Sequence, residues 1–63
     1  MSLLVRISGR DDEHELPVPA ELTPREELTR FLNRQGPHAQ LWIQLASGEY
    51  VRYDSVVSIR IQE

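Results

Sequence analysis

The C-terminal third of the chain, residues 39–62, alternates apolar and polar side chains with a period of two. The alternating segments are residues 39–45, 49–53 and 57–62. A period of two places successive side chains on opposite faces of a strand, and turn-forming residues between the segments are typical of an antiparallel meander. We therefore expect these segments to form the main sheet of a small α+β domain.

Two further strands are expected before the meander, at residues 3–8 and 14–18, with a polar turn between them. The first places Leu3, Val5 and Ile7 on one face, and the second places Leu16 and Val18 inward. Pro17 has no N–H to donate to a ladder, so the second strand should lie at a sheet edge.

A helix is expected from Pro24 to about Gln35. Thr23 is a good N-cap, Glu26 completes a capping box, and Gly36 is suited to end the helix. The apolar stripe of this helix is narrow and consists of Leu28, Phe31 and Leu32. One helix with one stripe covers only one face of a sheet.

The side-chain pattern also predicts the register of the meander. A three-residue loop at 46–48 pairs Ile43 with Val51 and places glycine where the turn needs a left-handed residue. A three-residue connection at 54–56 would then pair Tyr50 with Arg60. The same register pairs Gln44 with Tyr50, Trp42 with Arg52, and Val51 with Ile59. The residues expected to face inward are Leu41, Ile43, Leu45, Val51, Tyr53, Val57, Ile59 and Ile61.

The predicted fold is a single domain, residues 1–63, of order ββαβββ. Its single helix packs on one face of a mostly antiparallel five-stranded sheet. The first and last strands are expected to be neighbours, with the proline-bearing strand outside them. At 63 residues without cysteine, the chain is near the lower size limit for folding without disulfides. We therefore expect efficient packing or a partner subunit, and a homo-oligomer in particular.

The outward face of the predicted sheet is the candidate binding surface, because it has no cover within the chain. Its candidate partner-binding residues are Trp42, Tyr50, Arg52, Arg60, Gln44 and Arg6. Cross-strand packing alone would explain aromatic and arginine neighbours. The same residue types also anchor protein interfaces, and a tryptophan on an uncovered face favours that interpretation.

A single-stranded nucleic acid is the alternative partner, with bases stacked on Trp42 and Tyr50. The net charge of −3 and the acidic Glu49 and Asp54 near these residues count against it, because such binding is largely electrostatic. The function predicted from the sequence is thus a non-enzymatic interaction module that self-associates or docks a protein partner.

The sequence offers no catalytic, metal or cofactor site. The acidic segment 11–15 is interpreted as a solvated turn, and His38 as a loop residue without a ligand partner. Nucleophile motifs and a glycine-rich phosphate loop are absent, and no small-molecule substrate is indicated. An enzyme would need a concave pocket with a buried carboxylate or histidine, which the sequence gives no reason to expect.

No apolar run approaches membrane-spanning length, and residues 1–7 are too short for a signal peptide, so a cytoplasmic location is expected.

Several segments resemble a group of short actinobacterial proteins of unknown function. They are Val5-Arg6-Ile7-Ser8-Gly9, Glu15-Leu16-Pro17-Val18, Leu41-x-Ile43-x-Leu45 with Gly48-x-x-Val51, and Val56 to Ile61. The chain departs from that group by a shorter link between Val51 and Val56. The resemblance supports the topology and implies no activity. The element order is also similar to the ubiquitin-like β-grasp, but the chain lacks the diglycine tail of the small sulfur carriers with that fold.

Overall fold

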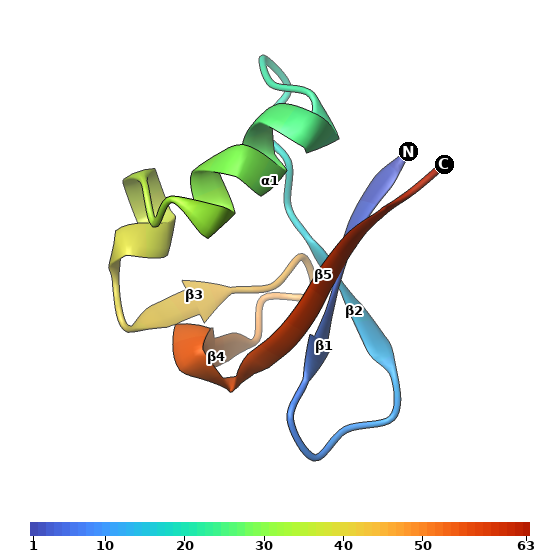
Figure 1. The fold of residues 1–63 in the computed structure, drawn as a ribbon, viewed down its shortest axis with the longest axis vertical. Helices are drawn as coiled ribbons and strands as arrows, with labels where there is room; N and C mark the ends of the chain where they lie inside the picture. Colours follow the sequence, from blue (N-terminus) through green and yellow to red (C-terminus); the bar gives the residue numbers. More distant parts are fainter.

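Two antiparallel sheets and one α-helix make up the fold in the computed structural model, which describes residues 1–63 (Figure 1). The elements are β1 (Ser2–Ile7), β2 (Glu13–Leu16), α1 (Pro24–Leu32), β3 (Trp42–Gln44), β4 (Tyr50–Arg52) and β5 (Val56–Gln62), with 3₁₀ turns η1 (Gly36–Ala39) and η2 (Tyr53–Ser55). One sheet has the order β2-β1-β5, and the other is the hairpin β3-β4. The α+β class and the single helix are confirmed, but the expected single five-stranded sheet is wrong.

The turn η2 explains why the sheet divides. The hydroxyl of Ser55 donates to the carbonyl oxygen of Arg52 at 2.6 Å, and this tight turn leads the chain away from β4. Strand β5 then pairs with β1 instead of β4, so the expected pairing of Tyr50 with Arg60 is wrong. The expected pairing of Val51 with Ile59 is wrong for the same reason.

Strand β1 is the centre of the three-stranded sheet. It pairs antiparallel with β2 on one side and with β5 on the other, which brings the two chain termini side by side (Figure 1). The first and last strands are neighbours as expected, and β2, which ends just before Pro17, lies at an edge.

An irregularity in the β1–β5 ladder changes which side chains face inward. Arg6 pairs with Ser58 and Ile7 pairs with Val56, so Val57 has no opposite residue. Such a bulge turns the extra residue away from the regular alternation. Val57 is consequently exposed, and the expectation that it faces inward is wrong.

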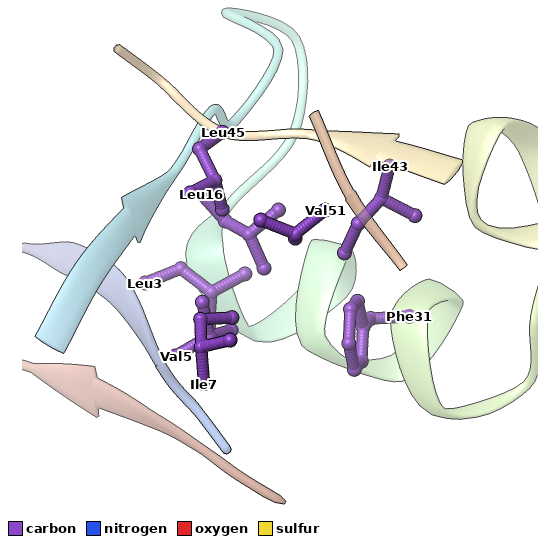
Figure 2. Packing of buried hydrophobic residues seen from close by; sticks show 8 residues of the cluster. All are labelled: Leu3, Val5, Ile7, Leu16, Phe31, Ile43, Leu45 and Val51. Atoms are coloured by element: carbon purple, nitrogen blue, oxygen red, sulfur yellow. The ribbon is translucent and has the colours of Figure 1, made fainter. Parts of the chain in front are cut away.

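The core lies between the two sheets and the helix (Figure 2). Its eight buried apolar residues are Leu3, Val5, Ile7, Leu16, Phe31, Ile43, Leu45 and Val51. Tyr53, Ile59 and Ile61 pack against it while half-buried. Leu41, at the open end of the hairpin, is half exposed, so its predicted inward position is also wrong.

The N-terminus of α1 has the predicted capping box. The Thr23 hydroxyl accepts from the Glu26 N–H at 3.1 Å, and the Glu26 carboxylate accepts from the Thr23 N–H at 2.8 Å. Of the predicted apolar stripe, Phe31 is buried and Leu28 is half-buried against the core. Leu32 is 60% exposed, so its assignment to the stripe is wrong.

The helix ends at Leu32, three residues before the predicted end at Gln35. Arg34 takes the left-handed conformation, with φ of 53°. The Gln35 N–H donates to the Arg30 carbonyl oxygen, and the Arg34 N–H donates to the Phe31 carbonyl oxygen, which together form a Schellman motif. Arginine therefore occupies the position for which the sequence suggested glycine.

The side chain of Arg34 compensates for this backbone strain. Its guanidinium donates to the carbonyl oxygens of His38 and Gln40, both at 3.1 Å, and lies 4.1 Å from the centre of the Tyr53 ring. The Tyr53 hydroxyl in turn donates to the Phe31 carbonyl oxygen at 2.7 Å. These contacts tie the end of α1 to both 3₁₀ turns.

Two polar contacts connect the hairpin to the three-stranded sheet at the opposite end. The Ala46 N–H donates to the Glu15 carbonyl oxygen at 2.9 Å. The Arg10 guanidinium donates to both carboxylate oxygens of Glu49, at 3.1 and 2.6 Å. The hydrogen bonds that Arg10 donates to Glu49 lower the pKa of Glu49 and raise the pKa of Arg10.

None of the helices has the length and apolar character needed to cross a membrane.

We predict that the pKa of Glu49 in the folded protein is below its value in the unfolded chain, and that Arg10→Gln moves it back towards the ordinary value. The Arg10–Glu49 contribution to stability is then complete above the unfolded pKa and lost as the pH falls through the lowered folded pKa. The contribution is small, because both side chains are exposed. NMR titration of the Glu49 carboxyl group measures the shift. An identical titration in the variant would contradict the assignment.

Candidate functional site

The outer side of the β3–β4 hairpin carries four of the predicted binding residues. We call this surface the hairpin face and define it by Trp42, Gln44, Tyr50 and Arg52. The predicted register is confirmed, since Trp42 pairs with Arg52 and Gln44 with Tyr50. The glycine of the predicted loop, Gly48, has a φ of 97° as the turn requires. Trp42 is 52% exposed and Tyr50 is 60% exposed.

The other two predicted residues, Arg6 and Arg60, lie on the three-stranded sheet. Arg60 pairs with Leu4 of β1, and its guanidinium donates to both carboxylate oxygens of Glu13 at 2.7 and 2.6 Å. Arg6 pairs with Ser58 on one side and with Glu13 on the other. The structure therefore groups the predicted residues on two sheets rather than on one.

Two of the outward arginines, Arg52 and Arg60, form ion pairs with carboxylates of the chain. Arg52 lies 3.3 Å from the Asp54 carboxylate, and Arg60 binds Glu13. The hydrogen bonds that Arg60 donates to Glu13 lower the pKa of Glu13 and raise the pKa of Arg60. The positive charge on both sheets is thus largely compensated within the chain.

A second candidate site lies under the helix, where two polar residues are buried. The Nε2 atom of His38 is 2.7 Å from Oε2 of Glu27, and both side chains are less than 5% exposed. Arg30 Nη1 donates to the other Glu27 oxygen at 3.3 Å. The ring of His38 packs edge-on against Phe31, with ring centres 5.2 Å apart. His38, expected from the sequence only as a loop residue, is thus buried in η1 with Glu27 as its hydrogen-bond partner.

This pair lines a cavity of about 320 Å³. The cavity is lined by the end of β2, by the linker that follows β2, and by α1, η1 and β3. The lining residues are Leu16, Pro17, Val18, Pro19, Glu27, Pro37, His38, Ile43 and Gln44. A concave site with a buried carboxylate and a buried histidine is thus present, contrary to the expectation from the sequence.

The sequence contained one signal for this site that was overlooked. Glu27 precedes Phe31 by four residues, so both lie on the same helix face, and Phe31 was assigned to the core. A carboxylate at a core-facing position needs a buried partner. Which residue supplies it depends on the path of the chain after the helix, and His38 lies eleven residues further on.

Comparison with protein-family models, with curated proteins and with solved structures finds no match to this chain. The two sites are therefore interpreted from their geometry.

We predict that His38→Ala and Glu27→Leu each lower the free energy of unfolding by about 3–5 kcal/mol, because each leaves a buried polar partner uncompensated. The double variant Glu27→Leu/His38→Leu should cost clearly less than the sum of the two single variants, since it leaves no buried charge. Chemical denaturation followed by circular dichroism measures these values. Additive costs would show that Glu27 and His38 do not act as a pair.

Proposed function

We propose that this protein is a non-enzymatic interaction module that self-associates or docks a protein partner through the hairpin face. The observation that carries the proposal is the exposure of Trp42 and Tyr50 on one side of a two-stranded sheet. Large aromatic side chains are enriched at the energetic centres of protein interfaces, because they bury much apolar surface at small entropic cost. Arg52, opposite Trp42, adds a donor that suits such an interface.

The hairpin face has no cover within the chain. The other side of the hairpin carries the buried residues Ile43 and Val51, which contact the core. A second layer on the outer side would have to come from another molecule. In a chain with only ten buried residues, covering these two rings would add substantially to the apolar surface removed from water.

The backbone of the hairpin also suits a protein partner. The Leu45 N–H donates to Glu49, and the Tyr53 N–H donates to Leu41, so these opposite pairs are hydrogen-bonded. By the alternation of an antiparallel ladder, the backbone groups of Trp42 and Gln44 point away from β4. An extended segment of a partner can pair with this edge while its side chains contact Trp42.

The cavity lacks the side chains most often used as nucleophiles, which supports a non-enzymatic role. None of the nine lining residues is serine, threonine, cysteine, lysine or tyrosine. Glu27 and His38 therefore have no hydroxyl, thiol or amine beside them in the lining to activate. A cytoplasmic location and a homo-oligomeric state are parts of the same proposal.

We predict that Trp42→Ala weakens association by about 2 kcal/mol or more, as expected for a central interface residue. Arg52→Ala should weaken association less, because Asp54 already compensates its charge. Sedimentation velocity over a range of concentrations measures self-association. For a foreign partner, the measurement is retention on immobilised wild-type protein compared with the variants.

The matched control is Leu32→Ala, which removes an equally exposed apolar side chain from the helix. It should leave association unchanged. A protein that stays monomeric at high concentration, and that retains no partner in a Trp42-dependent manner, would contradict the proposal.

Single-stranded nucleic acid is the competing partner, since Trp42 and Tyr50 offer stacking surfaces beside Arg52. Carboxylates already partner Arg52 and Arg60, which reduces the charge available for phosphates. We therefore predict that short oligonucleotides leave the fluorescence of Trp42, the sole tryptophan, unchanged at low salt. Quenching that weakens steeply with added salt would favour nucleic acid instead.

A further inference from the structure

Strand β5 is the longest strand of the fold and forms one edge of the three-stranded sheet. It has seven residues, compared with six in β1, four in β2 and three each in β3 and β4. In the order β2-β1-β5, only β1 is paired on both sides. A long edge strand presents a row of backbone donors and acceptors with which another strand can pair.

The opposite edge of the same sheet is protected against such pairing. Strand β2 is short and is followed at once by Pro17, which has no N–H to donate. The carbonyl oxygen of Glu15 in β2 already accepts from the Ala46 N–H at 2.9 Å. Strand β5 contains no proline, and Arg60 is its only charged residue. Because proline, charge and short length are the usual protection of an edge, β5 is the open edge of this sheet.

The single charge on β5 is held away from the open edge. Arg60 donates to both carboxylate oxygens of Glu13, at 2.7 and 2.6 Å. Glu13 belongs to β2, on the far side of β1, so the guanidinium reaches across β1 and its charge is compensated there. A charged side chain that ordinarily discourages edge-to-edge pairing therefore does not oppose it here.

The ladders identify the backbone groups that face outward from β5. The Glu15 carbonyl oxygen binds the hairpin, outside the sheet, so its opposite residue Leu4 directs its own backbone groups towards β5. Leu4 pairs with Arg60, which makes this pair hydrogen-bonded. By alternation, the N–H and C=O groups of Ile59 and Ile61 point away from β1. These four groups form the open edge.

The sequence of this edge is symmetric in character. It reads Ser58-Ile59-Arg60-Ile61-Gln62, with an apolar residue on each side of the arginine and a polar residue beyond each. A two-fold axis at Arg60 places Ile59 opposite Ile61 of a second copy, and both of these pairs are hydrogen-bonded. All four outward backbone groups of each copy then have partners. The two Arg60 side chains meet at the axis, where each is drawn back by Glu13 of its own copy.

Pairing of two β5 strands also enlarges a small core. Ile59 and Ile61 pack against the core but are only half-buried. With eight buried apolar residues and no cysteine, a chain of 63 residues has few means of stabilisation, and oligomerisation is a usual supplement at this size. The paired strands bring the four isoleucines together and remove more of their apolar surface from water.

From the open edge and its symmetric sequence we propose that two copies of the chain pair antiparallel through β5, about a two-fold axis at Arg60. The three strands of each copy then form one continuous six-stranded sheet. The occupant of the edge is a second copy rather than a foreign strand, because β5 is complementary to itself in backbone, apolar pattern and charge. This interface is separate from the hairpin face and does not rest on the function proposed above.

The first test is sedimentation equilibrium of the full chain, which should show a monomer–dimer equilibrium. Ile61→Pro removes an outward N–H without removing a donor to β1. Each dimer then loses two hydrogen bonds, so the dissociation constant should rise at least about tenfold. The matched control is Val57→Ala, on the same strand but outside the paired stretch, which should leave the dissociation constant unchanged. Circular dichroism establishes that both variants are folded.

Engineered cysteines test the register, since the chain has no cysteine of its own. In the proposed dimer, Ser58 lies opposite Gln62 of the second copy as a non-hydrogen-bonded pair, with Cα atoms about 4.5 Å apart, which is within the range of a disulfide. The double variant Ser58→Cys/Gln62→Cys should therefore form a disulfide-linked dimer with oxidised glutathione. Either single variant places its two cysteines roughly 13 Å apart across the axis and should not.

The proposal is overturned if the wild type stays monomeric at millimolar concentration, if a folded Ile61→Pro variant dimerises unchanged, or if the double-cysteine variant crosslinks no faster than the single variants. If Ile61→Pro does not fold, the crosslinking decides. Trp42→Ala should leave the dimer and the crosslink as in the wild type. Association that depends on Trp42 and not on β5 would overturn this inference while supporting the hairpin face.

Discussion

The antiparallel pairing of β1 with β5 is the constraint on which the rest of the structure depends. It joins the two ends of the chain, from Ser2 opposite Gln62 to Arg6 opposite Ser58. Because β5 pairs with β1, the hairpin β3-β4 is left as a separate two-stranded sheet that closes the core from another side. A two-stranded hairpin is only marginally stable by itself. The contacts of the hairpin with the helix and with β2 therefore decide whether it holds its position.

Those contacts are concentrated at the two ends of the hairpin. At one end, the Tyr53 ring lies between Phe31 and the guanidinium of Arg34, 4.7 Å from the Phe31 ring centre. At the other end, Glu49 binds Arg10 and Ala46 binds the backbone of Glu15. Between these ends, Ile43 and Val51 face the core, and the outer side is left to solvent. The aromatic hairpin face is thus a consequence of how the hairpin is attached.

The local features of this fold could be predicted from the sequence, whereas the path between elements could not. The capping box at Thr23 and the register around Gly48 depend on neighbouring residues, and both are confirmed. The separation of β5 from β4 depends on a three-residue turn whose direction has no clear sequence signature. The end of α1 was misjudged because Arg34 adopts a left-handed conformation that its side-chain contacts stabilise. The pairing of Trp42 with Arg52 followed from the sequence, whereas the separation of Arg6 and Arg60 onto another sheet, and the buried Glu27–His38 pair, did not.

The Glu27–His38 pair is difficult to explain by stability alone. Desolvation of two polar groups offsets most of what their hydrogen bond contributes, and apolar residues of similar size would serve a small core at least as well. The pair also leaves His38 Nδ1 unpaired, a cost that a domain with only eight buried apolar residues can compensate only in part.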